Sequence, residues 1–265
     1  MSDLTDQIEG FTRDQRRRGL APNTLRARER TLRLFERGPG LDATREQIED
    51  WLDGRNLCAK SRAVLLSHLG CFYAWRGGDN PVLGIKPPKL HRGLPRPIPD
   101  KDLTRALAKA TPLLRTWLLL GALEGLRCCE IAGLAREDLS ESEGLLRVVE
   151  AKGGNERMVP LHPKVLEALR AYGMPASGPL FLNRFHQRVS PGDVSHQIGD
   201  HLRSLGANGR AHSLRHWFGT NTLRQVHDVR VVQELLGHKD ISSTAIYTAF
   251  DQDAARSAVA GLRVG

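Results

Sequence analysis

A proline-rich, basic segment at residues 86–99 is the feature that most constrains how this 265-residue chain can fold. The segment holds five prolines, two lysines and two arginines. Proline fixes φ and lacks a backbone N–H, so a regular helix cannot run through this stretch, and proline-rich connections are extended and stiff. The segment therefore predicts a linker at 86–99 between two domains, residues 1–85 and residues 100–265.

The N-terminal domain shows the pattern of a helical domain. Leu65, Leu69 and Phe72 recur at i, i+4 and i+7, which is the spacing of one helix face. Thr44 is followed three residues later by Gln47, a capping-box pattern that marks a helix start. Four helices are predicted. The first covers residues 3–18, the second begins after Ala21-Pro22-Asn23, the third begins at Thr44, and the fourth covers residues 60–76.

The C-terminal domain mixes helices with one β-hairpin. The hairpin strands are predicted at 145–149 and 157–161, with Gly153-Gly154-Asn155 as the turn. The predicted helices open after Asp100 and after Thr111-Pro112 and then cover 162–172, 191–205, 212–224, 228–236 and 241–250, with a possible short strand at 180–182. The whole chain is therefore predicted to be mainly α with a small antiparallel β-sheet, an α+β fold.

The charge balance favours a nucleic-acid partner. There are 39 Lys and Arg residues against 30 Asp and Glu, a net charge of +9, and such an excess steers a protein toward a polyanion. Glu29 and Glu36 partly offset the cations of the first two helices, so a solvated face is the alternative to phosphate contact. The candidate DNA-binding residues are Arg16, Arg17, Arg18, Arg26, Arg30, Lys86, Lys89 and Arg92.

Cysteine usage and hydropathy favour a cytoplasmic protein. The four cysteines have no zinc-site spacing, and the neighbours Cys128 and Cys129 cannot easily form an ordinary disulfide, so reduced and mostly buried thiols are expected. Neither a secretion signal nor a long apolar run is present. We expect no metal and no cofactor.

A set of basic side chains followed by one tyrosine indicates phosphoryl chemistry. Arginine is planar, always charged and bidentate, which suits the oxygens of a pentavalent phosphate. A tyrosine has an ordinary pKa near 10, so it needs such cations, or a base such as histidine, to become a nucleophile at neutral pH. The candidate catalytic residues are Arg127, Lys152, His212, Arg215, His238 and Tyr247. Together they predict DNA strand transfer through a phosphotyrosine.

Each of these residues also has an ordinary structural explanation. Tyr247 can be a packed aromatic, Lys152 a solvated turn residue and His238 a helix cap. Arg127 can form a salt bridge with Glu130. The strand-transfer hypothesis therefore depends on all of them occurring together, in order, in one basic chain.

The motifs around these residues resemble those of the tyrosine recombinases, the family of phage integrases and Xer-like enzymes. The resemblance is carried by Gly125-Leu126-Arg127-Cys128-Cys129-Glu130, by the hairpin 151–161, by His212-Ser213-Leu214-Arg215-His216, and by Leu235-Leu236-Gly237-His238 with Tyr247 nine residues on. It implies Tyr247 as nucleophile, Arg127, Arg215 and His238 as phosphate ligands, His212 for the tyrosine proton, Lys152 as general acid toward the 5′ oxygen, and Glu130 as a supporting acid.

The resemblance also implies an architecture and partners. The helical domain resembles the family's core-binding domain, and residues 100–265 its catalytic domain. Because the helices begin almost at residue 1, we expect a simple recombinase without an arm-binding domain, acting on double-stranded core sites as a synaptic tetramer. The tail after Tyr247 docks on a neighbouring subunit in such assemblies; a frayed terminus is the alternative here. The alternative functions are type IB topoisomerase-like strand relaxation and a non-enzymatic DNA-binding regulator.

Overall fold

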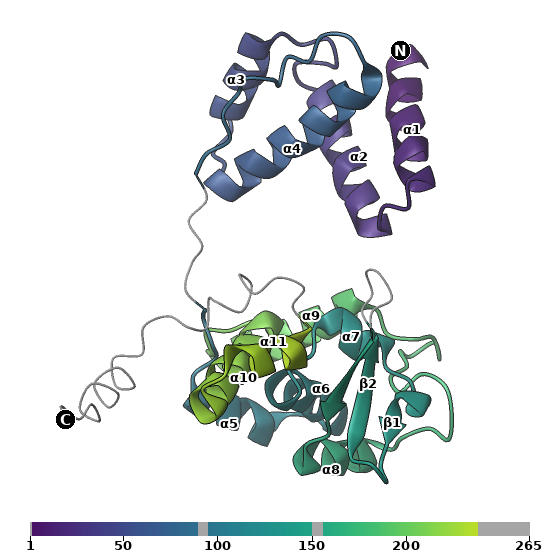
Figure 1. Cartoon of the computed structure of the whole chain (residues 1–265), viewed down its shortest axis with the longest axis vertical. Helices are drawn as coiled ribbons and strands as arrows, with labels where there is room; N and C mark the ends of the chain where they lie inside the picture. The colour runs from purple at the N-terminus through teal and green to yellow at the C-terminus, as the bar shows by residue number, and fades with distance from the viewer. Residues whose placement is uncertain (1, 90–94, 150–155, 238–265) are drawn as a thin grey trace, which may run out of the picture. The chain divides into compact units, whose positions relative to one another are not determined.

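The computed structural model describes residues 2–89, 95–149 and 156–237 of the chain, with side chains from residue 6 onward (Figure 1). The chain divides into two compact units, Met1–His91 and Arg92–Gly265. Helices dominate both, and a three-stranded antiparallel sheet lies in the second. The predicted fold class, mainly α with a small antiparallel sheet, is confirmed.

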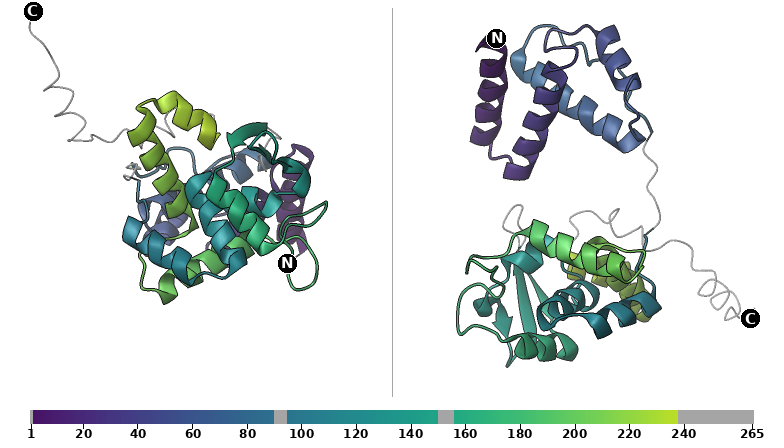
Figure 2. Two further views of the ribbon diagram at one scale, coloured as in Figure 1. Left: turned by 90° about the horizontal axis from the view of Figure 1, so that it is seen from below. Right: turned by 180° about the vertical axis from the view of Figure 1, so that it is seen from behind.

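The first unit is a four-helix domain. Helices α1 and α2 lie side by side, and α4 contacts both (Figures 1 and 2). The predicted capping box is present, because the Thr44 side chain accepts from the Gln47 N–H and the Gln47 side chain accepts from the Thr44 N–H. The helices are α1 (Ser2–Arg17), α2 (Pro22–Glu36), α3 (Arg45–Asp53) and α4 (Ala59–Arg76).

Aromatic side chains join these four helices. Phe11 of α1 meets Phe72 of α4 edge to face, with ring centroids 5.6 Å apart. Phe35 of α2 meets Trp51 of α3 at 5.1 Å in the same geometry. Such pairs add about 0.5–1.5 kcal/mol each beyond the area they bury, so the core of this unit is held together by apolar contacts.

The second unit surrounds one buried helix, α6. Its residues 116–122 are all buried, and it contacts α5, α7, α8, α9 and α10. Gly121 allows α10 to approach closely, since a Cβ there would lie 3.0 Å from Leu214 Cδ1. The elements are α5 (Asp100–Lys109), α6 (Pro112–Leu123), α7 (Cys128–Gly133), η1 (Arg136–Asp138), β1 (Leu139–Ser140), β2 (Leu145–Val149), β3 (Glu156–Pro160), α8 (Pro163–Tyr172), α9 (Pro191–Ser204), α10 (Ala211–Val226) and α11 (Val229–Leu236).

The sheet has the order β1-β2-β3. Val148 pairs with Arg157, and Leu146 pairs with Val159. Alternation along the strands puts these four residues on one face, and Leu146, Val148 and Val159 are buried there. An arginine thus occupies the apolar face of the sheet.

Several details differ from the sequence predictions. Residues 180–182 form no strand; Leu182 makes only an isolated bridge to Arg188. The short elements α7, η1 and β1 were not predicted, and the predicted helix 241–250 lies outside the described residues. The four cysteines are free, as expected, but none is fully buried: Cys58 precedes α4 and is exposed, and the others are half-buried.

Residue 85, directly before the predicted linker, and residue 98, near its end, are each buried in one of the two units. Ile85 is buried in the core of the first unit, and Ile98 in that of the second, where its N–H donates to Ser213 O at 3.2 Å. Lys86 and Lys89 are exposed, and Arg92 lies outside the described residues. None of the described helices has the length and apolar character needed to cross a membrane.

Candidate active site

A sharp turn after α6 places Arg127 at the start of α7. Gly125 has φ +65°, a conformation that favours glycine. A Cβ there would lie 2.5 Å from Phe218 Cδ1, so no other residue fits without displacement. The Leu126 N–H then donates back to Leu120 O at 3.1 Å. The turn therefore fixes the position of the Arg127 backbone at the start of α7.

Glu130 holds Arg127 from one turn further along α7. Its Oε2 accepts from the Arg127 backbone N–H at 2.8 Å, and its Oε1 accepts from Arg127 Nη1 at 2.8 Å. Glu130 is buried, whereas the Arg127 side chain remains 35% exposed. Arg127 is therefore both salt-bridged and accessible, so its ordinary structural explanation and a functional role are compatible.

Arg215 approaches the same carboxylate from α10. Its side chain is 1% exposed, and its Nη1 lies 3.6 Å from Glu130 Oε2. Arg215 also donates to two backbone carbonyls, Gly125 O and Leu236 O, each at 2.5 Å. A buried cation needs such partners. The carbonyls come from the turn before α7 and the end of α11, so Arg215 ties both to α10.

A third arginine, Arg157 of β3, was not predicted as a site residue. Its Nη1 and Nη2 donate to the two oxygens of Glu130, each at 3.0 Å. Burial alone would raise the pKa of Glu130, but the hydrogen bonds and charge of Arg157, with help from Arg127 and Arg215, hold that pKa below its usual value. The sequence feature that could have pointed to Arg157 is its place on the apolar face of a predicted strand, where a charged side chain needs a partner.

His212 lies in the first turn of α10, and its ring contacts that of His216 with centroids 4.4 Å apart. The pKa of His212 is lowered, first because neighbouring protein atoms keep water from part of the ring and second because the charges of Arg215 and Arg127 disfavour a proton there. The residue as a whole is nevertheless exposed. Burial, His212 and Arg215 lower the pKa of His216 to about 4. Both imidazoles are therefore neutral near pH 7, and His212 can accept a proton.

Three predicted site residues, Lys152, His238 and Tyr247, lie outside the described residues. The structure brings together the other predicted ones: Arg127 and Arg215 both contact the Glu130 carboxylate, and His212 is one helical turn from Arg215.

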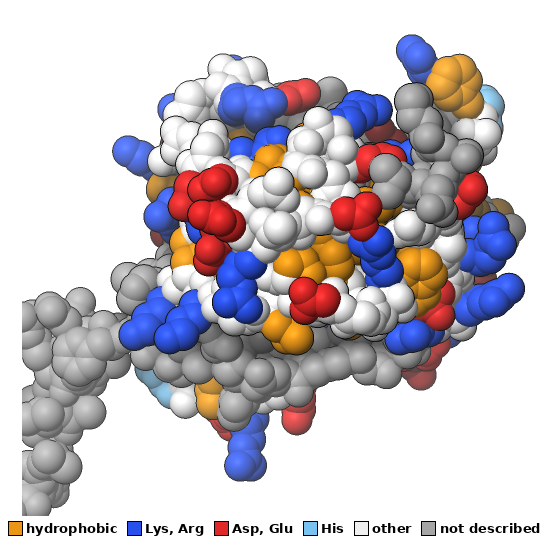
Figure 3. Space-filling view, turned by 90° about the horizontal axis from the view of Figure 1, so that it is seen from above, with side chains coloured by type: hydrophobic (Ala, Val, Ile, Leu, Met, Phe, Trp, Pro, Cys, Tyr) orange, Lys and Arg blue, Asp and Glu red, His pale blue; other side chains and the backbone are white. Residues whose placement is uncertain are grey.

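The predicted DNA-binding arginines of α1 and α2, and Arg18 directly after α1, are exposed. Arg18 forms an ion pair with Asp14 at 2.9 Å, and Arg26 donates to Asn23 at 2.8 Å. Arg16, Arg17 and Arg30 are also exposed. Basic and acidic side chains are interspersed over the face of the molecule in Figure 3. These predicted cations are exposed, and the face drawn in Figure 3 is not uniformly basic.

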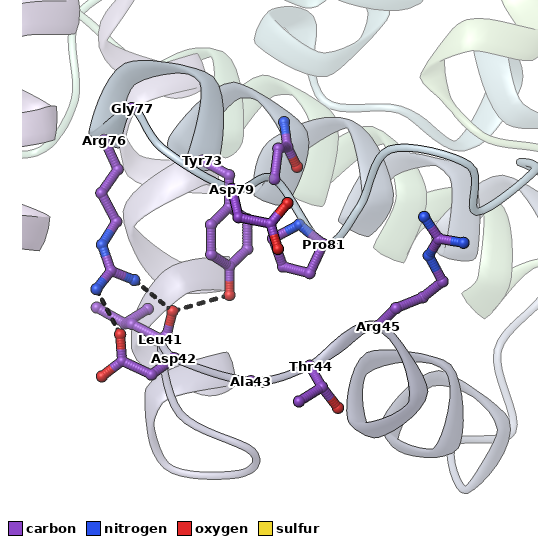
Figure 4. Close-up of a pocket in the computed structure, with 11 residues that line it drawn as sticks. Leu41, Asp42, Ala43, Thr44, Arg45, Tyr73, Arg76, Gly77, Asp79 and Pro81 are labelled. Carbon is purple, nitrogen blue, oxygen red and sulfur yellow. Dashed lines mark hydrogen bonds and ion pairs between the residues drawn. The ribbon is translucent and has the colours of Figure 1, made fainter.

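The first unit also contains a cavity of about 620 Å³ between the loop before α3 and the end of α4 (Figure 4). Tyr73 Oη and Arg76 Nη1 both donate to Leu41 O, at 2.9 and 2.7 Å. Burial raises the pKa of Tyr73 to about 12. These side chains hold the loop before α3 against α4, and we assign the cavity no catalytic role.

Comparison with known proteins agrees with this geometry. The phage integrase family matches residues 101–253. The chain is 38% identical over 212 residues to tyrosine recombinase XerC of Azotobacter vinelandii, covering 73% of this chain and 70% of that protein. It is 34% identical over 285 aligned positions to XerC of Pelobacter propionicus, covering 96% and 93%.

A solved structure shares the fold. A lambda integrase tetramer bound to a Holliday junction superposes with a TM-score of 0.75 at 21% identity, covering 94% of this chain and 79% of that one. The family match and the two relatives identify the sequence, and the solved structure agrees with its fold. The chain therefore belongs to the phage integrase family and is a tyrosine site-specific recombinase.

Proposed function

We propose that this enzyme cuts DNA by attack of Tyr247 on the scissile phosphate, with Arg127 and Arg215 as the ligands of that phosphate. The observation that carries the proposal is that both arginines bind one buried carboxylate, Glu130. One carboxylate does not neutralise the arginines around it. The remaining positive charge, held in fixed positions, is complementary to a phosphate that gains charge in the transition state.

In the first step Tyr247 Oη bonds to phosphorus, and the bond from phosphorus to the 5′ oxygen breaks. His212 takes the tyrosine proton; its lowered pKa keeps the ring unprotonated near neutral pH, so that a nitrogen is available to accept that proton. Lys152 donates a proton to the departing 5′ oxygen, and His238 donates a hydrogen bond to the phosphate. In the second step the 5′ hydroxyl of a partner strand attacks, and the bond to Tyr247 breaks. Phosphodiester bonds are conserved in number, so the exchange needs no external energy source.

The proposed partner is double-stranded DNA carrying short core recombination sites. The exposed cations of α1 and α2 would contact phosphates, together with Lys86, Lys89 and Arg92. The lambda integrase structure is a tetramer on a Holliday junction, and we propose a synaptic tetramer here too. The tail after Tyr247 would dock on a neighbouring subunit.

The test is covalent trapping with wild type and Tyr247→Phe. Each is mixed with a plasmid carrying the DNA beside the gene, and the products are separated on a denaturing gel. We expect a protein–DNA adduct with wild type alone, while the variant still binds the DNA. An adduct with Tyr247→Phe would show that another residue is the nucleophile.

A second substrate tests strand exchange. A plasmid with two copies of the trapped site should yield recombinant products. Relaxed plasmid without recombinants would instead indicate topoisomerase-like religation of the same strand, and binding without any adduct would indicate a DNA-binding regulator.

A further inference from the structure

The Arg157 side chain is held by several hydrogen bonds within the protein. Its Nη1 and Nη2 bind both oxygens of Glu130, and its Nε donates to Leu235 O at 2.9 Å. The side chain is only 10% exposed. All three guanidinium nitrogens are therefore engaged within the protein, so Arg157 is poorly placed to bind DNA itself.

These contacts join three elements that are distant in sequence. Arg157 belongs to β3, Glu130 to α7 and Leu235 to α11; α11 contacts β3 and α7 contacts β2 (Figure 1). The next carbonyl, Leu236 O, holds Arg215. Two successive carbonyls at the end of α11 are thus bound by two arginines, both of which also contact Glu130.

The fit at the end of α11 is close. Gly237 caps the helix with φ +62°, and a Cβ there would lie 2.9 Å from Arg157 Nη1. The chain continues from Gly237 directly to His238, and β3 begins four residues after Lys152. Arg157 therefore joins the described backbone that follows the Lys152 segment to the described backbone that precedes His238.

We propose that Arg157 is a positioning residue for strand cleavage. It holds Glu130 against the end of α11 and thereby sets Arg127 and Arg215 around one phosphate position. The assignment rests on the proposed function for its effect on cleavage. A planar, bidentate group is required, because Lys would supply a single nitrogen where Arg157 supplies three.

The variants Arg157→Ala and Arg157→Lys test this, with Arg147→Ala as the matched control. Arg147 lies on the neighbouring strand β2 and binds Asp138 through Nε and Nη2 at 3.0 and 2.8 Å, without contacting Glu130. We expect both Arg157 variants to slow single-turnover adduct formation about 10- to 100-fold, the effect seen when a residue that orients a metal ligand is lost, taken here by analogy. Their DNA affinity should stay within about 3-fold of wild type. Arg147→Ala should match wild type in both.

A double-mutant cycle separates positioning from loss of fold. If Arg157 acts through Glu130, Arg157→Ala should add little to the defect of Glu130→Gln. Defects that multiply fully would overturn the proposal. So would wild-type cleavage by Arg157→Ala, or a loss of DNA affinity as large as the loss of cleavage rate, which would make Arg157 a DNA contact.

A readout without DNA keeps this inference separate from the proposed function. The pKa of His212, followed by NMR, responds to Arg215 and Arg127. If Arg157→Ala lets these arginines shift, that pKa should move away from its wild-type value, while Arg147→Ala leaves it in place. An unchanged His212 pKa in folded Arg157→Ala would overturn the proposal. A wild type that forms no adduct would refute the proposed function alone.

Discussion

The two units of this enzyme bury polar side chains of different kinds. In the part of the chain that the structure describes, the buried polar residues of the first unit, Gln15 and Thr31, are uncharged. The second unit buries five ionisable side chains, which are Asp102, Glu124, Glu130, Asp138 and Arg215. Removing one ion from water costs several kcal/mol in a real protein. Burial of the ionised members of this set therefore costs the second unit free energy of folding, whereas Glu124, with its pKa raised to about 8, avoids this cost by keeping its proton near neutral pH.

The arginines of the two units differ in the same way. Arg16 and Arg30 of the first unit point into solvent, where they can adapt to a phosphate backbone. Arg215 is fixed by two carbonyls and a carboxylate. Adaptable surface cations suit binding, whereas fixed buried cations need no rearrangement when charge develops in a transition state. We therefore propose that the exposed arginines contribute DNA affinity and that the buried arginine contributes to the chemistry.

The largest expected effect tests the buried cation. Arg215→Ala should reduce the rate of adduct formation by about 10²–10³ or more, the scale of one lost transition-state donor. It should also lower the free energy of unfolding by about 3–5 kcal/mol, because a buried ion pair and two carbonyl contacts are broken. Single-turnover trapping and urea unfolding measure the two quantities.

Arg127→Ala is the control for that prediction. Its side chain is 35% exposed, whereas that of Arg215 is 1% exposed, so the loss of cleavage should be similar while the loss of stability should be much smaller. Equal destabilisation by the two changes would contradict the distinction between fixed and accessible arginines.

The next effect concerns pH. Burial raises the pKa of Glu124 to about 8, although its Oε1 accepts from the His162 N–H at 2.8 Å. The folded state thus retains a proton that the unfolded chain releases near the ordinary glutamate pKa of 4.5, so stability falls as pH rises from about 4.5 to 8. Glu124→Gln should remove a pH-dependent loss on the order of 1–4 kcal/mol, measured by urea unfolding at pH 5 and pH 8. An unchanged difference between the two pH values would show that Glu124 is ionised in the fold.

Local patterns made most helices predictable. The helix starts at Thr44, Thr111 and Ser190 follow from capping residues and prolines that act within a single turn. Helix α7 has six residues, too few to show periodicity. The apolar run 180–182 suggested a strand, but Leu180 donates to Leu134 O and Phe181 O accepts from Val189 instead of pairing along a strand.

The site was predictable in part for a different reason. Arg127 and Arg215 belong to short motifs, and Glu130 follows Arg127 by three residues, so family resemblance pointed to all three. Arg157 binds a carboxylate 27 residues away and a carbonyl 78 residues away. No local sequence pattern predicts contacts between residues so far apart in the chain. The alternation of β3 indicated only that this arginine faces the core, and the tertiary fold was needed to name its partners.

The smallest expected effect tests the surface cations. Arg26→Ala and Arg30→Ala should each weaken DNA binding less than about 10-fold and reduce the slope of log affinity against log salt by about 0.9, the loss of one phosphate contact. Arg33→Ala on the same helix is the control: Glu29 already binds Arg33 at 2.8 Å, so its salt slope should change less. Titration of labelled site DNA at several salt concentrations measures these slopes. If the slopes do not change for Arg26→Ala and Arg30→Ala, α2 does not contact DNA, and affinity must come from cations elsewhere in the chain.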